Sequence, residues 1–407
     1  MTRKCKLAAA VVAAAIVLSG WTLARADWPC WSGPQRDKRS TDTGLLKEWP
    51  AGGPKLLWKA QGIGSGYSSP TWVDGKIYIT GDKGDDLVLT CLDTQGKKLW
   101  SKVVGPAFKT SWPGARSSAT YDDGKLYLVA GSGLVVCCDA KTGEKVWTRN
   151  FSEFAGKKPH WGFAESVLVT GEMAVVTPGG TACMVALNKK TGKNIWQSEK
   201  FGAAHYCSAI AVEYKGVSMI INGTAGGLIG VDAKTGKTLW TNDFAAGNTA
   251  NCPSPMFSDG YLFWAVGYGR GAVCLKLDVA DGKVTATEAY RSKDMVCHHG
   301  GFVLDGGHVY GDNGGGVSCI ELASGKTKWK HPAVGKGSLI WADGMLYLFG
   351  EKDGQAALAA ASPEGLKITG KIQVAGKGPS WAHPVVTNGS LLLRYDDTLY
   401  VYSIKAQ

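Results

Sequence analysis

The stretch DAKTGEKVW, residues 139–147, recurs along the chain and decides its fold. Close copies end at Trp196, Trp240 and Trp329, and a shortened copy, DTQGKKLW, ends at Trp100. In each copy an Asp or its substitute closes a strand, and a glycine takes a left-handed turn that other residues resist. The Trp then lies on the returning strand. The phrase therefore predicts one β-hairpin, written repeatedly.

A second series of turns counts the repeats. These turns are Asp74-Gly75, Asp123-Gly124, Gly171, Lys215-Gly216, Asp259-Gly260, Asp305-Gly306, Asp343-Gly344 and Asn388-Gly389. Eight turns flanked by alternating apolar stretches, at intervals of forty-odd residues, are typical of a propeller. We predict an all-β protein, an eight-bladed β-propeller of four-stranded antiparallel blades, with seven blades as the alternative.

The two ends of the chain are predicted to share one blade. The eighth repeat stops after residues 400–404, before its outer strand, while a strand-like stretch near the start of the chain ends at Trp58 without a partner. Pairing this N-terminal strand with the C-terminal ones closes the ring. We expect one propeller domain over residues 27–407, in which residues 27–52 form a lead-in segment, because repeat folds grow blade by blade.

The recurring Trp has a structural role in this interpretation. A large ring with a donor nitrogen covers the neighbouring blade while its N–H finds a backbone acceptor. The fifth and seventh blades have Ala286 and Thr369 at the equivalent position. We therefore expect weaker interfaces at these two blades.

The first 26 residues are predicted to be a cleaved signal peptide. Arg3, Lys4 and Lys6 form a basic stretch, residues 7–18 are apolar, and Ala24-Arg25-Ala26 is a small-x-small cleavage site. An uncleaved membrane anchor is the alternative, but a dozen apolar residues are short of the roughly 20 that span a bilayer. Because no later segment is long and apolar enough to cross, we expect an exported protein of the bacterial periplasm, the cell envelope or the medium.

The charge indicates the kind of partner. The formal net charge of +11 falls to +7 without the signal peptide, which has four basic residues and no acidic one. This modest excess suits an anionic ligand or surface. The basic residues are spread through the repeats, so nucleic acid binding is not expected.

The repeated phrase resembles the tryptophan-docking motif of the pyrroloquinoline quinone (PQQ) repeat superfamily of quinoprotein propellers, over residues 50–407. The resemblance implies the fold. It implies less about function, because the superfamily includes calcium- and PQQ-dependent alcohol dehydrogenases and also non-enzymatic binding scaffolds such as the outer-membrane assembly protein BamB. The compact size and the N-terminal run up to Trp58 resemble secreted bacterial PQQ-like repeat proteins.

The segments that open each blade are predicted to meet at the rim of a central channel, the usual ligand site of a propeller. The candidate rim residues are Tyr67, Arg116, Trp161, Glu165, Tyr206, His299, Lys336 and Trp381. The resemblance implies a PQQ pocket with cations against the carboxylates, an aromatic floor, calcium ligands and a base. Arg116 and Lys336 are candidates for the cations. Trp161 or Trp381 is a candidate for the floor, and Glu165 for a metal ligand or catalytic base. A solvent-filled channel lined by mutually bonded polar groups is the alternative.

A second set of residues comes from three successive blades. It consists of His205, Cys207, Cys252, Cys297 and His298. Thiols and imidazoles at one place suit zinc or copper, and Cys207 and Cys252 are alternatively a disulfide between blades. The third interpretation is buried cysteines beside channel histidines.

The neighbouring pair Cys137-Cys138 resembles the vicinal disulfide of some quinoprotein alcohol dehydrogenases. Here the pair lies in a predicted strand, where successive side chains point to opposite faces. A disulfide would distort that strand, so free thiols are favoured.

Two hypotheses on function remain. The first is an exported, monomeric binding or scaffold propeller whose rim binds a protein, a polysaccharide or a small anionic ligand. The second is a PQQ- and calcium-dependent quinoprotein oxidoreductase acting on an alcohol or sugar. No counterpart of the Glu, Asn and Asp set that holds calcium in those dehydrogenases is found, so the first is favoured.

Overall fold

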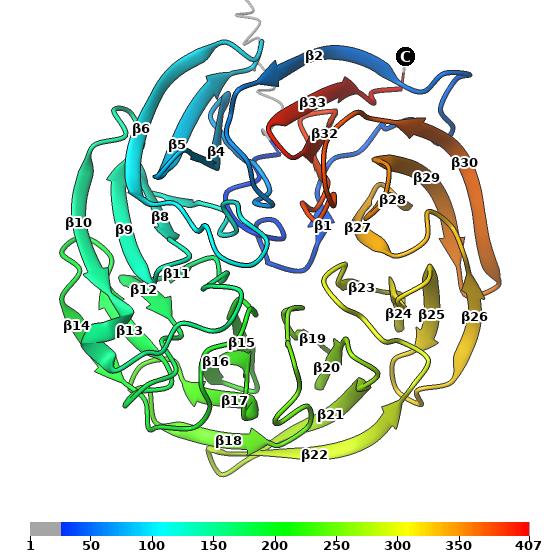
Figure 1. Ribbon diagram of the computed structural model, residues 1–407. Helices are drawn as coiled ribbons and strands as arrows, with labels where there is room; N and C mark the ends of the chain where they lie inside the picture. Colours follow the sequence, from blue (N-terminus) through cyan, green and yellow to red (C-terminus); the bar gives the residue numbers. More distant parts are fainter. Residues whose placement is uncertain (1–25, 407) are drawn as a thin grey trace, which may run out of the picture.

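The computed structural model describes residues 26–406 and forms a ring of eight β-sheets (Figure 1). Each sheet contains four strands in antiparallel order, and one contains a fifth. The predicted all-β, eight-bladed propeller is therefore confirmed. The predicted signal peptide lies, apart from its last residue, outside the described residues.

The blades follow one another in chain order. The first four contain β3 (Thr71–Val73), β4 (Lys76–Lys83), β5 (Asp86–Asp93), β6 (Lys98–Pro106); β7 (Thr120–Asp122), β8 (Lys125–Val129), β9 (Leu134–Asp139), β10 (Lys145–Asn150); β11 (Leu168–Thr170), β12 (Met173–Val176), β13 (Val185–Asn188), β14 (Asn194–Gln197); and β15 (Ile210–Tyr214), β16 (Val217–Thr224), β17 (Gly227–Asp232), β18 (Thr238–Asn242). The next three contain β19 (Met256–Ser258), β20 (Tyr261–Val266), β21 (Gly271–Ala280), β22 (Lys283–Ser292); β23 (Phe302–Asp305), β24 (His308–Asp312), β25 (Val317–Glu321), β26 (Thr327–His331); and β27 (Gly337–Ala342), β28 (Met345–Gly350), β29 (Gln355–Ser362), β30 (Gly365–Gln373). The eighth contains β31 (Val385–Thr387), β32 (Ser390–Tyr395), β33 (Thr398–Ser403) and β2 (Lys55–Gln61).

The turns that counted the blades have the backbone that tight hairpins require. At the first of them Asp74 has a φ of 49° and Gly75 a φ of 70°, and Asn388 and Gly389 repeat the pattern at 52° and 68°. Two successive positive φ values match the twist of the strands that the turn joins. Asp, Asn and Gly tolerate them best, so local chemistry sets these hairpins.

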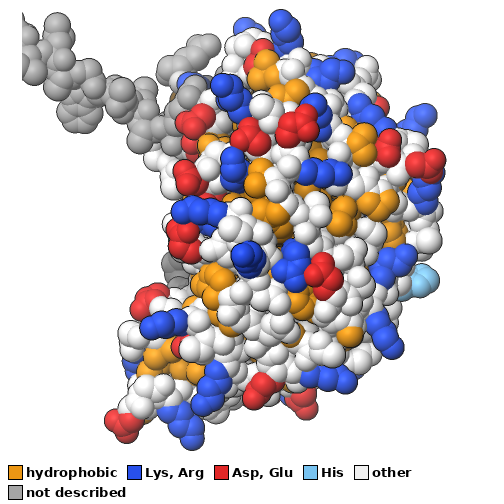
Figure 2. Space-filling model, turned by 90° about the vertical axis from the view of Figure 1, so that its left-hand side faces the viewer, with side chains coloured by type: hydrophobic (Ala, Val, Ile, Leu, Met, Phe, Trp, Pro, Cys, Tyr) orange, Lys and Arg blue, Asp and Glu red, His pale blue; other side chains and the backbone are white. Residues whose placement is uncertain are grey.

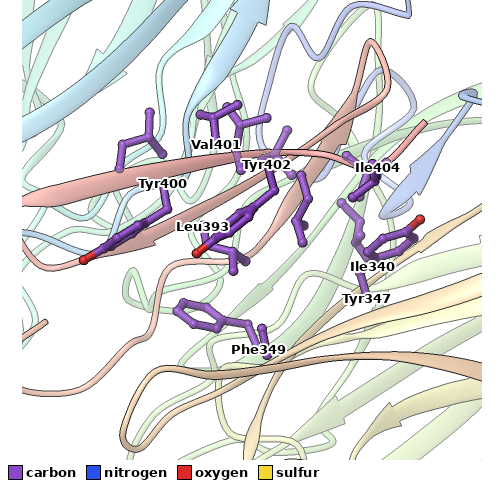
Figure 3. Packing of buried hydrophobic residues seen from close by; sticks show 14 of the residues in the cluster. Ile340, Tyr347, Phe349, Leu393, Tyr400, Val401, Tyr402 and Ile404 are labelled. Carbon is purple, nitrogen blue, oxygen red and sulfur yellow. The ribbon is translucent and has the colours of Figure 1, made fainter. Parts of the chain in front are cut away.

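The N-terminal strand closes the ring, as predicted. β2 pairs antiparallel with β33, from Lys55 opposite Ser403 to Gln61 opposite Thr398. Figure 3 shows side chains of β32 and β33 pointing toward those of β27 and β28 in the preceding blade. The closing blade is thus held both by its ladder and by an apolar interface.

The lead-in segment, residues 27–52, crosses the centre of the ring (Figure 1). Trp28 pairs with Trp72 at its start. Further along, β1 (Arg39–Ser40) runs parallel to β27 and adds the fifth strand to the seventh blade. Leu45 then pairs with Lys405 beside the eighth blade. The sequence did not predict this path, which ties the lead-in to three blades.

Most recurring tryptophans contact the hairpin turn of the next blade. Their indole N–H groups donate to backbone oxygens: Trp58 to Thr94 (2.8 Å), Trp147 to Lys189 (2.9 Å), Trp196 to Ala233 (3.0 Å) and Trp329 to Ser362 (2.8 Å). The rings of Trp58, Trp147 and Trp196 lie against the turn glycine, and a Cβ added to Gly192 would meet the Trp147 ring at 2.8 Å. The turn glycine is therefore needed for its φ and for this close approach.

Aromatic side chains also fill the two interfaces expected to be weaker. In the fifth blade Tyr290 packs against Gly325 of the next turn, and its hydroxyl donates to the Leu322 oxygen at 2.9 Å. In the seventh blade Trp49 of the lead-in packs against Gly370. Tyr290 lies four residues after Ala286 on the same strand, and Trp49 comes from a distant segment. The repeat phrase therefore did not reveal either of them.

We expect Tyr290→Phe to lower the free energy of unfolding by about 1 kcal/mol, because it removes one hydrogen bond to a buried carbonyl and keeps the ring. Tyr261→Phe is the matched control, since the Tyr261 hydroxyl bonds to no other described residue. Urea unfolding of both variants measures the difference. Equal stabilities would show that the Tyr290 ring acts without its hydroxyl.

The outer surface carries mixed charge. Figure 2 shows Lys and Arg interspersed with Asp and Glu over the face that it presents, with apolar side chains between them. Within residues 26–406 the structure has no helix with the length and apolar character of a membrane span.

The 3-10 turn η1 (Phe151–Phe154) links the second and third blades.

Candidate ligand-binding site at the centre of the ring

A chain of serine hydrogen bonds joins the innermost segments of neighbouring blades. The N–H of Ser69 donates to Oγ of Ser118 at 2.8 Å, and the N–H of Ser118 donates to Oγ of Ser166 at 3.0 Å. The pattern continues through Ser208 at 2.9 Å and Ser254 at 3.3 Å. These bonds satisfy backbone donors that lie ahead of the short inner strands. They set the spacing of the segments that surround the channel.

Arg36 of the lead-in fills one side of the channel. It is only 5% exposed. Its guanidinium donates to the backbone oxygens of Ser166 (3.2 Å) and Val167 in the third blade and of Ala209 (2.8 Å) in the fourth. A fourth acceptor is Oγ1 of Thr120 in the second blade, at 3.4 Å. One side chain thus ties three blades together at the axis.

Lys38 fills the opposite side. Its Nζ donates to the Gly300 oxygen at 3.1 Å and contacts Nδ1 of His383, whose Nε2 bonds to the His299 oxygen at 2.9 Å. Burial lowers the pKa of Lys38 to about 7 and holds the pKa of His383 well below its usual value. His383 is therefore a neutral acceptor at Nδ1.

Beside the lead-in residues that fill the channel lies a cavity of about 430 Å³. Its aromatic lining consists of Trp31, Tyr67, Trp112, Trp161, Tyr206, Tyr268 and Trp381. Its ionisable lining otherwise consists of Arg116, Cys252, His298, His299, Lys336, Glu351 and His383. The structure brings all seven candidate cofactor-binding residues named from the sequence to this one cavity. Glu165 does not line it.

The aromatic rings of the cavity contact one another. Trp381 is the centre of one group, with ring centroids 4.8 Å from Tyr67 and 4.8 Å from His299. Trp161 and Tyr206 form a second group, with centroids 5.8 Å apart. Mutual packing fixes the orientation of each ring, so the cavity is largely pre-formed.

Two aromatic residues at the cavity are held in an unusual backbone conformation. Trp112 has a φ of 55° and Tyr268 a φ of 57°, and they are 50% and 49% exposed. Positive φ is costly for bulky residues, and such strain concentrates at ligand sites. Tyr268 rests edge-on against His298 at 4.8 Å, and Trp112 against Trp381 at 5.0 Å. Both rings present apolar surface to an incoming ligand.

Arg116 supports one of these loops. Its guanidinium donates to the backbone oxygens of Trp112 (2.5 Å), Gly114 (2.6 Å) and Ser111 (3.2 Å), and it stacks 4.3 Å above the Phe108 ring. A clamp for a ligand carboxylate needs free guanidinium donors. Both terminal nitrogens of Arg116 bond to backbone oxygens of residues 111–114, so it positions the Trp112 loop, and its remaining N–H groups are the donors left for a ligand.

Lys336 is held in a polar group on the other wall. Its Nζ lies 2.8 Å from Oε2 of Glu351 and 2.7 Å from Nδ1 of His298, and His299 lies 3.5 Å from the same carboxylate oxygen. Burial, reinforced by Lys336, lowers the pKa of His298 to about 4 and holds that of His299 well below its usual value. At neutral pH the wall therefore offers one ion pair and two uncharged imidazoles, which are donors and acceptors together.

Glu165 is buried in the third blade. Its Oε1 accepts the N–H of Thr177 at 2.6 Å, and the side chain is 4% exposed. Burial raises its pKa to about 7, although nearby Arg36 acts in the opposite direction. A residue that coordinates a metal ion or acts as a catalytic base must reach the bound molecule, and Glu165 does not line the cavity.

The structure does not bring all the predicted Cys and His residues of the second set to the cavity. Nδ1 of His205 accepts the Asn251 N–H at 3.2 Å, and the Cys207 thiol donates to the Asn251 oxygen at 3.2 Å. Cys297 is buried and its sulfur accepts the Gly301 N–H at 3.0 Å. These three side chains are engaged by backbone groups and do not line the cavity.

The remaining members, Cys252 and His298, do line it. Burial raises the pKa of Cys252 to about 12, so it remains a neutral thiol, which is a poor metal ligand. Within residues 26–406, no three His, Cys, Asp or Glu side chains are grouped to hold a metal ion. All cysteines of that range are free, including the pair Cys137-Cys138 in β9.

The cavity fits only part of what PQQ with calcium requires. Its aromatic walls suit a flat ring. Calcium, however, takes six to eight oxygen ligands, commonly from several carboxylates. Glu351 is the one acidic side chain among the described residues that line the cavity, and it is paired with Lys336. This donor set does not fit a calcium site.

Several cavity residues were not predicted from the sequence because they lie outside the segments that open each blade. Tyr268 lies between β20 and β21, and Glu351 between β28 and β29. In an antiparallel blade the turn between the second and third strands is at the same end as the start of the first. Topology alone could have added these turns. Trp31 had no such signal, because its position depends on the path of the lead-in.

Comparison with known proteins gives partial matches of two kinds. The chain is 30% identical to the quinoprotein ethanol dehydrogenase of Pseudomonas putida over 33% of this chain and 24% of that protein. It is 24% identical to the outer membrane protein assembly factor BamB of Shewanella oneidensis over 52% of each chain. The matches thus span about half or less of these curated relatives.

A solved structure of BamB from Moraxella catarrhalis aligns with a TM-score of 0.60 at 15% identity, covering 86% of this chain and 99% of that one. This likeness shows the fold. The family model described as outer membrane protein assembly factor BamB matches residues 84–331, which is more than half of the sequence. With its eight repeated blades and this match, the chain belongs to the BamB-like family of PQQ-like repeat propellers.

Proposed function

We propose that this protein is an exported binding propeller of the bacterial cell envelope that holds a saccharide in its central aromatic cavity. The observation that carries the proposal is the combination of pre-packed aromatic rings with an ion pair and neutral imidazoles in one cavity of about 430 Å³. Sugar rings have apolar C–H faces that pack on flat aromatic rings. Their hydroxyl groups both donate and accept, as the Lys336–Glu351 pair with its histidines does.

Location in the envelope rests on two supports. One is the predicted signal peptide, and the other is the family, whose described member is an outer membrane protein assembly factor. A binding role is favoured over oxidoreductase activity because the cavity lacks a set of oxygen ligands for calcium among the described residues. The protein is proposed to act as a monomer.

Trp161→Ala tests the cavity directly. We expect the variant to bind a neutral oligosaccharide, such as cellohexaose, about tenfold more weakly than the natural protein, because it loses a stacking ring worth about 1.4 kcal/mol. Quenching of Trp fluorescence and titration calorimetry measure the affinity. Trp329→Ala is the control, since Trp329 lies at a blade interface and its loss should lower stability without changing affinity.

The competing function is tested with the same protein. PQQ is titrated with and without calcium. Saturable, calcium-dependent PQQ binding at micromolar concentration, with no saccharide binding, would overturn the proposal in favour of a quinoprotein oxidoreductase.

A further inference from the structure

A second hollow, the basic groove, lies between the fourth and fifth blades. It has a volume of about 450 Å³, and its lining includes Asp243, Phe244, Ala246, Arg270, Arg291 and Lys293. Three of these side chains are cationic and one is acidic. Because Arg291 is also paired with Glu288, these groups together have a net excess of one positive charge. The lining shares no residue with the cavity, and its Phe244 belongs to the buried core of the fourth and fifth blades.

The cations of the basic groove are fixed in place. Arg291 is held by a two-bond contact with Glu288, with both bonds 2.9 Å long. Lys293 donates to the backbone oxygens of Gly269 (2.7 Å) and Arg270 (3.1 Å). Arg270 in turn donates to the Ala246 oxygen at 3.0 Å. Each keeps further N–H groups for a ligand, and ordering them in advance lowers the cost of binding.

The basic groove and the aromatic cavity are lined by residues of the same two chain segments. The turn of residues 267–270 supplies Tyr268 to the cavity and Arg270 to the groove. The segment after β18 supplies Ala250 to the cavity and Ala246 to the groove. Tyr268, half-exposed and at positive φ, thus lies two residues from Arg270 in the turn that the two hollows share.

We propose that the basic groove is an anion-binding extension of the central cavity, so that the ligand is an acidic oligosaccharide whose sugar rings lie on the aromatic walls and whose acidic groups reach Arg270, Arg291 and Lys293. This inference rests on the proposed function. Guanidinium and ammonium groups bind carboxylates and sulfates alike. An acidic peptide is less suited, because extended peptides are recognised mainly through strand edges, whereas side chains form these walls.

The test compares three probes: an oligogalacturonate hexamer, a sulfated oligosaccharide of the same length and neutral cellohexaose. The variant is the triple change Arg270→Gln, Arg291→Gln and Lys293→Gln. Its control is the triple change Lys190→Gln, Lys193→Gln and Lys234→Gln, at exposed turns between the third and fourth strands of the third and fourth blades. We expect the groove variant to bind an acidic probe at least tenfold more weakly, with a flatter salt dependence, and cellohexaose unchanged. The probe with the larger loss identifies the acidic group.

Two failures are distinguishable. If cellohexaose binds and depends on Trp161, but acidic probes bind the groove variant as tightly as the natural protein, the inference is overturned and the proposed function stands. If no saccharide binds in a Trp161-dependent way, both are overturned. Tighter, groove-dependent binding of hexaglutamate than of either acidic saccharide would overturn the saccharide in favour of a peptide. Circular dichroism verifies that both triple variants are folded.

Discussion

Arg36→Met is expected to lower the free energy of unfolding by about 2–6 kcal/mol, because it leaves two buried carbonyl oxygens without a donor. The Arg36 guanidinium is bonded to backbone oxygens of Ser166, Val167 and Ala209. Methionine fills much of the same space but leaves the Ser166 and Ala209 oxygens without a donor, and each unsatisfied group costs about 1–3 kcal/mol. The Val167 oxygen still accepts the Thr120 hydroxyl. The substitution affects the second, third and fourth blades together, because Thr120 of the second blade is a further partner of Arg36.

Lys47→Met is the matched control, in the same lead-in segment. Lys47 pairs with Asp343 at 2.8 Å, but its side chain is 56% exposed, and exposed ion pairs contribute about 0–1 kcal/mol. Denaturant unfolding monitored by Trp fluorescence gives both values. If Arg36→Met and Lys47→Met lose the same small amount, the lead-in does not hold the ring together.

Glu165→Gln is expected to change how stability depends on pH. Burial raises the pKa of Glu165 from 4.5 to about 7 in the folded protein. The folded state therefore binds an extra proton between these values, and the stability that the neutral carboxyl allows is present below pH 4.5 and lost as the pH rises through 7. At about 1.4 kcal/mol per unit, the charged group costs on the order of 3 kcal/mol above pH 8.

Glutamine keeps the oxygen that accepts the Thr177 N–H and has no charge to bury. The variant should be about as stable as the natural protein at pH 4.5 and more stable at pH 8, by up to about 3 kcal/mol. Glu172→Gln, at an exposed turn where Glu172 pairs with Lys190, should show no such difference. A stability difference that is the same at both pH values would exclude titration of Glu165 as its cause.

The turns could be predicted because their causes are local, and ring closure could be predicted because the eighth repeat lacks the outer strand that the N-terminal stretch supplies. Asp74-Gly75 and Asn388-Gly389 need only two residues that tolerate positive φ. The residues before each inner strand occupy the same place in every repeat, so Tyr67 and Trp381 could be named together from sequence. The structure places them 4.8 Å apart.

The roles of individual side chains could not be predicted in this way. Arg116 and Lys336 both lie at the cavity, but the first bonds to its own loop and the second to Glu351. A repeat pattern tells which end of a blade a residue occupies. It does not tell which of several nearby acceptors a long cation will choose, because that depends on loops from other repeats.

The sequence by itself determined the architecture: the repeated turn, the count of blades and the strand that closes the ring. The tertiary structure alone decided what fills the centre. Arg36 and Lys38 lie in a polar run that reads as an exposed loop, yet both are buried. Their acceptors are backbone oxygens from different blades, Ala209 and Gly300 among them, that face one another only after the ring has closed. Burial of a cation depends on such partners, and no local pattern contains them.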